Sequence, residues 1–437
     1  MHPYIRRRKG EEPVTFLHPL LEPSLAKTLG VPLFQEQLMQ MAIDVAGFSA
    51  AEADQLRQAM ASKRSERRMA ELRERFFEGL AGNGITGDTA TAVWEKLAAF
   101  ANYGFPESHS VSFAYLVYAS SWLKFHHPAA FCAALLDSQP MGFYSPQSLT
   151  QDAVRHGVEV RTPDLHASDA VTTLESGTAL ESGTERRGRE DGDPATWGFG
   201  GPAVRLGIGS VRGIGPDLAA EIAAGRPYSD IGDLARRVRL SVAQLESLAT
   251  AGAFGCFADA DGRPLERRRA IWTAGAAALT GADRLPGIAV GMEAPRLPGM
   301  DEWEESVADL CSTGVAPGGH PIRFLREDLD GRGVVPASAL RDEADAATVR
   351  VAGVVTHRQR PATASGVTFL NLEDETGLVN VVCSIGCWTR FRTVLRTAVA
   401  LEVRGKLERS PDGVLNVVAH HVVPLPVTAG VASRDFR

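Results

Sequence analysis

The period of the hydrophobic residues changes along this chain, and that change limits the folds it can adopt. From Pro32 to Leu136 apolar side chains recur about every 3.6 residues, as in "LFQEQLMQMAIDVAGF", which predicts helices. From Thr348 onward apolar and polar residues alternate, which predicts strands. Since each period suits one kind of element, we expect a mainly α, multidomain first part and an all-β last part.

Five strand candidates follow Thr348, and a helical segment separates the third from the fourth. The strands are "VRVAGVVTH", "VTFLNLED", "LVNVVCS", "AVALEVRGKLE" and "VLNVVAHHVVPL", and the helix is "CWTRFRTVLRT". The stretches "DETG" and "SPDG" supply turns between strands. A helix in that position of a five-stranded barrel is typical of the OB-fold. We therefore expect an OB-fold over residues 347–425 and a tail over 426–437.

Composition divides the rest of the chain into further segments. The stretch "LESGTALESGTERRGREDGDPATWGFGG" is polar, glycine-rich and aperiodic, so it marks a boundary between two helical groups. The acidic run from Asp301 to Glu305 is expected to lie in a linker. The expected segments are an entry stretch over 1–30, a helical domain over 31–169, a flexible or weakly β insertion over 170–203, a helical pair over 204–257 and a connecting segment over 258–346 with one helix around 265–279.

Length, charge and cysteine content exclude several classes of protein. With 437 residues, 44% of them apolar, the chain can form several domains that each bury a core. A net charge of −7 excludes a wholly basic nucleic-acid binder, so such binding would need local patches. Five scattered cysteines, of which only Cys383 and Cys387 are close, indicate neither a disulfide framework nor a zinc site.

The sequence shows no targeting or membrane segment. No apolar stretch follows the basic start "MHPYIRRRKGEEP", so a signal peptide is not expected. The longest apolar-rich run, Val111 to Phe125, is too short to span a bilayer. We expect a soluble, cytoplasmic protein without a membrane partner.

A basic stretch lies in the helix that is expected to open at Ser49, where Glu52 completes a capping box. "RQAMASKRSERRMAELRER" holds seven basic and three acidic side chains. On one continuous helix, Arg57, Arg64 and Arg68 share a face, with Lys63 beside them. Fixed cations there could hold a triphosphate or a nucleic-acid backbone. The alternative is a solvated helix face with internal salt bridges.

The stretch "SVRGIGPDLAAEI" predicts a helix-hairpin-helix. Gly213 and Gly215 let the backbone approach a ligand closely, Pro216 opens the next helix, and Arg212 adds a cation. Amides at such a helix start bind phosphate and position DNA without reading its sequence. A second hairpin is expected at "LATAGAFG", around Gly252. The alternative for each is a tight turn between helices that serves packing alone.

The barrel also offers side chains for a nucleic-acid strand. The candidates are Arg358, Arg360, Phe369, Trp388 and Arg392. Aromatic and cationic side chains on such a barrel suit single-stranded nucleic acid, through stacking and phosphate attraction. Phe369 and Trp388 could equally belong to the core.

Motifs for a complete active site are missing from the sequence. There is no D-x-D pair on a strand, no phosphate loop of the G-x-x-x-x-G-K-[ST] type and no H-E-x-x-H motif. Asp374 and Glu375 fall in an expected barrel turn. We therefore predict no catalytic residue and no metal ligand in this chain.

Two long motifs resemble a known family. "LGVPLFQEQLMQMAIDVAGFSAAEADQLRQAMASKR" and "FANYGFPESHSVSFAYLVYASSWLKFHHPAAF" are similar to the fingers of bacterial C-family DNA polymerases, the DNA polymerase III alpha subunit and its damage-tolerance relatives. The hairpins and the barrel follow in that family's order, so the resemblance runs from about Tyr4 to Leu425. "GFPESHS" with "LLDSQPMGFYSP" is similar to the error-prone branch, because the replicative branch usually has a basic residue in place of Glu107.

The resemblance implies roles for several fingers residues. The incoming triphosphate would contact Arg57, with Lys63 and Arg64 as weaker candidates, although a second family arginine is replaced by Gln58. In "FPESHSVSF", Ser108 or Ser110 would cap a helix, and His109 would project from its start toward the nucleotide. The alternative is a histidine satisfied within an N-cap network.

The same resemblance implies partners and a missing part. The family's magnesium-binding aspartates lie in a palm that precedes the fingers, and we expect this chain to begin near "YIRRRKGEEP" where the palm ends. It would be the C-terminal half of an error-prone DNA polymerase, partnered by primer-template DNA, deoxynucleoside triphosphates, the N-terminal half and damage-tolerance accessory proteins. Alone it would bind DNA without extending it. One alternative is a non-catalytic DNA-binding remnant. A weaker one is RNA binding, since "FLNLEDETG" also resembles aminoacyl-tRNA synthetase barrels.

Overall fold

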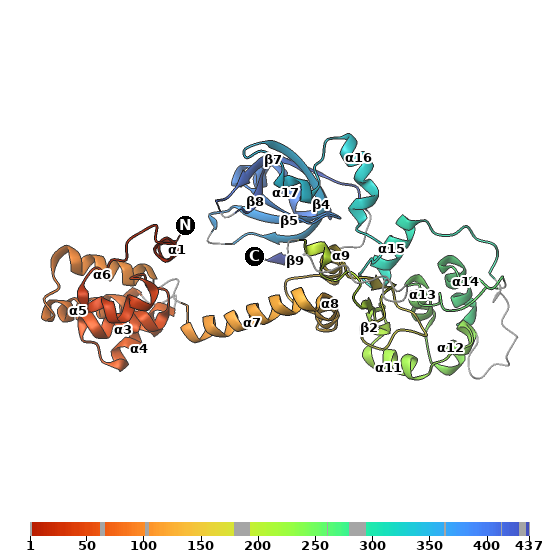
Figure 1. Cartoon of the computed structure of the whole chain (residues 1–437), viewed down its shortest axis with the longest axis horizontal. Coiled ribbons are helices and arrows are strands. Elements are labelled where there is room, and N and C mark those ends of the chain that lie inside the picture. Colours follow the sequence, from red (N-terminus) through yellow and green to blue (C-terminus); the bar gives the residue numbers. More distant parts are fainter. Residues whose placement is uncertain are drawn as a thin grey trace. The chain divides into compact units, whose positions relative to one another are not determined.

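The computed structural model describes residues 2–61, 66–100, 105–178, 193–259, 261–278, 294–361, 364–411, 413–427 and 434–436 (Figure 1). The chain forms two compact units, Met1–Ser121 and Trp122–Arg437. The described helices are α1 (Pro3–Arg8), α2 (Glu22–Leu25), α3 (Gln35–Ala46), α4 (Ala50–Ala61), α5 (Glu66–Gly82), α6 (Gly87–Phe100), α7 (Glu107–His126), α8 (Pro128–Asp137), α9 (Pro146–Arg155), α11 (Pro216–Ala224), α12 (Ile231–Arg237), α13 (Val242–Thr250), α14 (Arg267–Ala277), α15 (Glu302–Ser312), α16 (Arg326–Gly331) and α17 (Ile385–Thr397). In the described parts of the chain, no helix has both the length and the apolar character that crossing a membrane requires.

The first unit is a helical bundle around α3. Its core contains aromatic rings in contact, with Phe76 lying 5.8 Å from Phe48 and 5.4 Å from Trp94 between ring centroids. Gly47 is the C-cap of α3 and adopts the left-handed conformation at φ 61°, which a glycine accommodates without strain. The predicted capping box at the start of α4 is also confirmed, because the Ser49 hydroxyl accepts from the Glu52 amide at 3.2 Å and Glu52 accepts from the Ser49 amide at 2.7 Å.

The basic stretch does not lie on one continuous helix, and this corrects the sequence prediction. The Arg75 guanidinium on α5 donates to Glu52 on α4 at 3.0 Å and to the Gly47 carbonyl at 3.1 Å. In a continuous helix Glu52 and Arg75 would be about 35 Å apart, at about 1.5 Å per residue. α5 therefore returns alongside α4, so the predicted single helix through Arg57 and Arg75 does not form. The burial of Phe76 and Leu80 on α5 supplies the apolar contact that favours this return.

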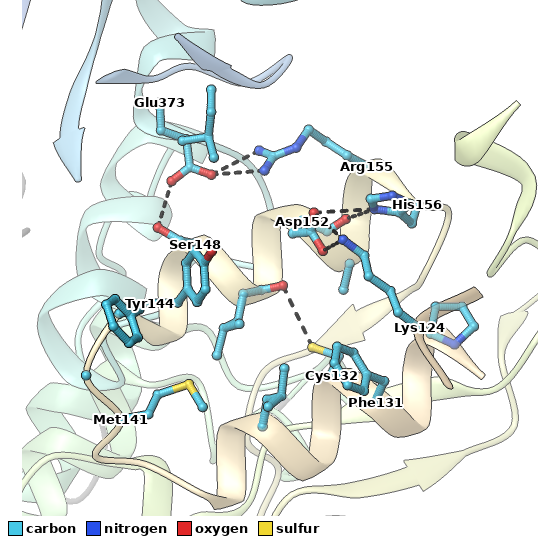
Figure 2. A pocket seen from close by; sticks show the side chains of 17 residues that line it. Lys124, Phe131, Cys132, Met141, Tyr144, Ser148, Asp152, Arg155, His156 and Glu373 are labelled. Atoms are coloured by element: carbon cyan, nitrogen blue, oxygen red, sulfur yellow. Dashed lines mark hydrogen bonds and ion pairs between the residues drawn. The ribbon is translucent and has the colours of Figure 1, made fainter. Parts of the chain in front are cut away.

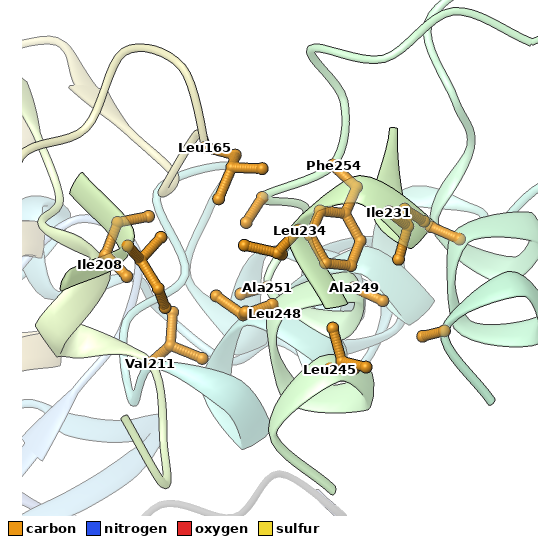
Figure 3. Packing of buried hydrophobic residues seen from close by; sticks show 14 of the residues in the cluster. Leu165, Ile208, Val211, Ile231, Leu234, Leu245, Leu248, Ala249, Ala251 and Phe254 are labelled. Carbon is orange, nitrogen blue, oxygen red and sulfur yellow. The ribbon is translucent and has the colours of Figure 1, made fainter. Parts of the chain in front are cut away.

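The second unit contains a small sheet and a helical cluster. The strands β1 (Val160–Arg161), β3 (Ala203–Arg205) and β2 (Thr173–Glu175) lie in that order, with β1 parallel and β2 antiparallel to β3. α11 to α14 enclose one hydrophobic core, in which Figure 3 shows Leu234, Leu245, Leu248 and Phe254 packed together. Each of these four side chains is fully buried, so the hairpin region has a core of its own.

The C-terminal barrel has the predicted fold. Its strands are β4 (Thr348–Gln359), β5 (Thr368–Glu373), β6 (Leu378–Cys383), β7 (Ala400–Arg409) and β8 (Leu415–Pro424), with α17 between β6 and β7. The hydrogen-bonded order β5-β6-β8-β7-β4 closes through an additional β4–β5 pairing. β6 and β8 are parallel, whereas the other neighbours within the barrel are antiparallel. A short β9 (Arg434–Phe436) adds to β4 in parallel. The predicted mainly α chain with a C-terminal OB-fold is therefore confirmed.

The acidic run expected in a linker instead begins a helix. Asp301 is the N-cap of α15 and accepts from the Glu304 amide at 2.8 Å, while Glu304 accepts from the Asp301 amide at 3.1 Å. This is a capping box with Asp at the N-cap, and its carboxylates also favour the positive end of the helix dipole. These acidic groups therefore stabilise a helix start.

A buried carboxylate joins α9 to the barrel (Figure 2). Glu373, at the end of β5, is 1% exposed. Both terminal nitrogens of Arg155 donate to its Oε1 at 3.1 Å, and the Ser148 hydroxyl donates to its Oε2 at 2.8 Å. Burial raises the pKa of Glu373, and Arg155 opposes that rise. The pair is well satisfied, so removing one partner would leave a buried charge.

Replacing Arg155 by alanine should lower the free energy of unfolding of this unit by about 3 kcal/mol, because Glu373 would lose its cation in a buried site. Lys124→Ala is the control, because it removes another ion pair made by α9; its partner Asp152 is 39% exposed, so the loss should stay below about 1 kcal/mol. Urea denaturation at neutral pH measures both. Equal losses in the two variants would contradict the role given to Glu373.

A second buried titratable group lies in the segment before the barrel. His320 is 2% exposed and caps the 3₁₀ turn Pro321–Leu325, where its Nδ1 accepts from the Ile322 amide at 3.2 Å. Burial, together with the nearby cations Arg155 and Arg326, lowers the pKa of His320 to about 3. The folded protein therefore holds this histidine neutral at a pH where the unfolded chain protonates it.

The pKa of His320 is lower in the folded protein than in the unfolded chain, where it is about 6.5. The stabilisation contributed by the neutral imidazole is therefore complete above pH 6.5 and is lost as pH falls toward 3. Between pH 7 and pH 5, the wild type should lose about 2 kcal/mol more of its unfolding free energy than His320→Asn. Asparagine keeps a capping acceptor but does not titrate. Urea denaturation at the two pH values measures the difference, and parallel pH profiles would refute it.

Candidate nucleic-acid interface

The first predicted hairpin has an open helix start. Gly213 has φ +84°, Ile214 is buried, and Gly215 is the N-cap of α11, directly before Pro216. A Cβ at Gly215 would meet nothing within 4 Å, so a ligand can approach this backbone closely. Gln244 on α13 donates to the Gly213 carbonyl at 3.0 Å and fixes the turn.

The surroundings of this turn include one cation and one anion. Arg212 is exposed beside it, and its amide donates to the Ser312 carbonyl at 2.7 Å. Asp217 lies in the first turn of α11 and is exposed as well. The α11 amides and Arg212 would therefore attract a phosphate at the helix start, whereas the carboxylate of Asp217 would repel it.

The second predicted hairpin is closed, which corrects the assignment of Gly252 to DNA. Gly252 has φ +79°, and a Cβ there would lie 2.9 Å from Nε of Arg267. The Arg267 guanidinium covers this glycine and donates to Asp309 at 2.6 Å. The amide of Gly252 donates to the Ala249 carbonyl at 3.0 Å. The glycine makes room for an internal arginine rather than for a phosphate.

Among the predicted barrel residues, Arg358 binds the end of a helix within the protein. Its Nε donates to the Leu395 carbonyl at 2.8 Å, and its Nη2 donates to the Ala398 carbonyl, at the end of α17. These carbonyls lack partners within the helix, so Arg358 satisfies them. Arg358 thus stabilises the end of α17, and its contact with DNA stays a prediction.

The other barrel candidates lie near the surface. Phe369 is 37% exposed on β5. The Arg360 guanidinium lies over the Trp388 ring, 5.1 Å from its centroid, and Trp388 packs partly against the barrel core. Arg392 is exposed on α17. The sequence analysis allowed either a core or a surface position for Phe369 and Trp388. In the structure Phe369 is accessible and Trp388 is partly buried.

The predicted nucleotide residues lie on separate helices of the first unit. Arg57 on α4 pairs with Asp54 at 2.8 Å, and that contact lowers the pKa of Asp54. Ser108 and His109 lie in the first turn of α7. Lys63 and Arg64 lie outside the described residues.

The predicted cap of the aromatic helix is wrong. α7 begins at Glu107, and the Pro106 carbonyl accepts its first helical bond from the Ser110 amide at 3.1 Å. Ser108 and Ser110 are therefore inside the helix, where the Ser110 hydroxyl donates back to the Glu107 carbonyl at 2.8 Å. His109 is exposed between two aromatic rings, with centroids 4.9 Å from Phe105 and 4.4 Å from Phe113.

A cavity of about 440 Å³, which the sequence analysis did not predict, lies between α8, α9 and the barrel (Figure 2). Its walls are mainly apolar, with Phe131 and Met141 on one side and Tyr144 at its edge. One pair of its charged groups, Arg155 and Glu373, joins residues more than two hundred positions apart in sequence. The one local signal was an acidic residue, Glu373, at the end of an otherwise apolar strand.

The described residues offer no fit for the magnesium that the resemblance implies. Within those ranges, no three histidine, cysteine or acidic side chains gather closely enough to hold a metal ion. All five cysteines are free thiols.

Comparison with known families identifies three regions of the chain. Residues 1–84 match the model described as the bacterial DNA polymerase III alpha subunit finger domain. Residues 157–263 match a helix-hairpin-helix motif, and residues 349–425 match an OB-fold nucleic acid binding domain. The fingers, hairpin and barrel parts of the resemblance are thus confirmed in the predicted order.

Curated relatives extend this similarity over the whole chain. The chain is 56% identical to a protein named Error-prone DNA polymerase from Nocardia farcinica, across 100% of this chain and 37% of that protein. It is 53% identical to a protein of the same name from Mycobacterium tuberculosis, across 100% of this chain and 38% of that protein. The chain thus spans a little over a third of the length of these relatives. A solved asparaginyl-tRNA synthetase from Pyrococcus horikoshii aligns at 22% identity over 22% of this chain and 24% of its own, but a TM-score of 0.19 carries no argument.

The two hairpin glycines should respond differently to substitution. Gly213→Ala should lower the unfolding free energy by about 1–2 kcal/mol, because its φ of +84° disfavours any side chain. Gly215→Ala should cost less than about 1 kcal/mol, yet weaken binding of duplex DNA about tenfold by blocking the approach to the α11 amides.

Urea denaturation and fluorescence anisotropy with labelled duplex DNA separate the two effects. Gly331→Ala, at another glycine with open space around its Cα, is the control that should change neither. Undiminished DNA binding by a folded Gly215→Ala protein would show that the open helix start does not contact phosphate.

Proposed function

We propose that this chain supplies the incoming-nucleotide and DNA-binding part of an error-prone DNA polymerase that acts in DNA damage tolerance. The observation that carries the proposal is the identity above 50% along the entire chain with proteins named Error-prone DNA polymerase. The activity of such a protein is template-directed transfer of a nucleotide from a deoxynucleoside triphosphate to a primer. A cytoplasmic location accords with that role and remains a prediction.

For the nucleotide, we propose contacts from α4 and the start of α7. Arg57 is half-exposed and would exchange Asp54 for a phosphate, which a guanidinium binds in a bidentate manner. Ser108 and His109 are exposed at the N-terminal turn of α7, whose dipole favours negative charge. We also propose Lys63 and Arg64 as nucleotide contacts, because the family motif includes these positions.

For DNA, we propose two contact regions in the second unit. The start of α11, with Gly213, Gly215 and Arg212, would bind a phosphate of the duplex without reading its sequence. The barrel surface with Phe369, Arg360 and Arg392 would bind the single-stranded template through stacking and charge. The partners are primer-template DNA and deoxynucleoside triphosphates, together with the remaining polymerase polypeptide and damage-tolerance accessory proteins.

The proposed role is binding rather than bond formation. Polymerases of this kind use divalent metal ions at converging carboxylates. The described residues lack such a cluster, so we derive no chemical step from them. The same observation favours a second candidate function, a non-catalytic DNA-binding protein that uses the hairpin and the barrel.

A chimaera tests the proposal against the second candidate. The matching 37% of the Nocardia farcinica protein is replaced by this chain, and primer extension is measured on a primer-template. We expect extension by the chimaera, and we expect Arg57→Ala in it to raise the nucleotide concentration for half-maximal rate about tenfold, through loss of one charge-assisted contact. Gln58→Ala, on the next position of α4, is the control that should leave this concentration unchanged.

The outcomes separate the candidates. A folded chimaera that binds DNA with a steep salt dependence but does not extend a primer supports the non-catalytic candidate and refutes the first. A chain that binds neither duplex nor single-stranded DNA at low salt refutes both. Preference for transfer RNA over DNA in competition would support the RNA-binding alternative.

A further inference from the structure

The cavity beside the barrel has the size and the walls of a site for a small flat ligand. Its volume of about 440 Å³ lies within the range of ligand pockets. Phe131 from α8 and Phe143 and Tyr144 from the loop before α9 contribute aromatic rings, and Met141 and Leu149 contribute aliphatic surface. Phe143 is 65% exposed and Tyr144 is 49% exposed, so rings stand at its mouth where a ligand can stack.

The charges of the cavity are neutralised within its own walls. Lys124 pairs with Asp152 at 2.7 Å, and Asp152 also lies 3.6 Å from His156. Arg155 is held by Glu373 through two contacts of 3.1 Å. Figure 2 shows the Lys124–Asp152 pair on the side opposite Met141 and Tyr144, and the Arg155–Glu373 pair along the top of the view. A phosphate would have to break these pairs, whereas a neutral flat group could use the apolar wall without doing so.

The cavity continues the outer face of β5 and β6. In the β5–β6 ladder, Phe369 is opposite Val382, Asn371 is opposite Asn380, and Glu373 is opposite Leu378. Alternate residues of a strand share a face, so the exposed Phe369 and the cavity wall at Glu373 lie on one face, about 13 Å apart along the strand. Asn371 and Asn380 lie between them and offer amide donors and acceptors. Leu378, 46% exposed, lines the cavity at the end of this path.

We infer that this cavity takes one unstacked nucleobase from a single strand of DNA that crosses the β5–β6 face. The inference rests on the proposed function, because the barrel must first bind the strand. The strand would stack a base on Phe369, pass the two asparagines, and place another base against Tyr144. A neutral, flat and mainly apolar ring fits the paired charges and the aromatic mouth, and a polymerase that tolerates damage would thereby hold a template base outside the stacked strand.

The test uses the full chain and an oligodeoxynucleotide of about 12 residues, a length that an OB-fold site covers. One position at a time is replaced by an abasic residue, and binding is measured by fluorescence anisotropy. We expect two positions, one for each stacked base, at which the abasic residue weakens binding about tenfold. In Tyr144→Ala the penalty should disappear at one of them, the sensitive position, while Tyr144→Phe should keep it there, because a phenyl ring still stacks.

A 2-aminopurine at the sensitive position gives an independent readout, since its fluorescence should fall on binding to the wild type and not to Tyr144→Ala. Trp272→Ala removes another exposed ring, 52% accessible on α14, and should keep the full penalty. If Phe369→Ala weakens binding but no abasic position depends on Tyr144, the cavity inference is wrong and the proposed function stands. If the wild type does not bind single-stranded DNA, the proposed function itself fails.

Discussion

The placement of the barrel against α9 depends on one buried carboxylate. Glu373 ends β5 on the outer face of the barrel, where an apolar residue would be easier to bury. The cost of burying it is partly offset because Arg155 and Ser148 together bind both of its oxygens. Such an arrangement is sensitive to geometry, since a small displacement of α9 would leave an uncompensated charge. The pair therefore fixes the register between a helix and a strand that are far apart in sequence.

The same contact shapes the cavity. Because Arg155 and Lys124 are both engaged by carboxylates, the walls between them carry little net charge. The remaining surface comes from aromatic and aliphatic side chains of α8 and of the loop before α9. The ion pairs on one side of the cavity and the apolar wall on the other thus both follow from the way α9 packs. α9 is held on one side by Arg155 and Glu373, and on another by the buried Ala153, which belongs to a small apolar cluster with Cys132 of α8.

Elements that local sequence specifies were predictable, and long-range contacts were not. The barrel followed from strand alternation and from turns such as the one where Asp374 accepts from the amides of Thr376 and Gly377 at 2.8 and 2.9 Å. The helix at Asp301 carried its own capping-box signal, which acidic composition obscured. By contrast, nothing near Arg75 in sequence indicates that it bonds Glu52 and turns the chain back. The closure of the second hairpin likewise depends on Arg267, which approaches from a later helix.

For the candidate site, the sequence identified cationic residues but not their partners. The open turn at Gly215 could be anticipated because its features are local. Whether an arginine faces solvent depends on which carbonyl or carboxylate lies beside it in the folded chain, as Arg57 beside Asp54 illustrates. Arginine makes this distinction hard, because its planar fork suits helix ends and phosphates equally well.

The contacts of the Arg358 guanidinium restrict which residues can replace it. It spans two carbonyl oxygens at the end of α17 from a neighbouring strand, and so finishes a helix that has no glycine at its C-cap. A lysine would place a single ammonium where two directed donors are used. We would therefore expect drift at this position to be restricted even between residues of equal charge, whereas an exposed arginine such as Arg396 of α17 should accept that exchange.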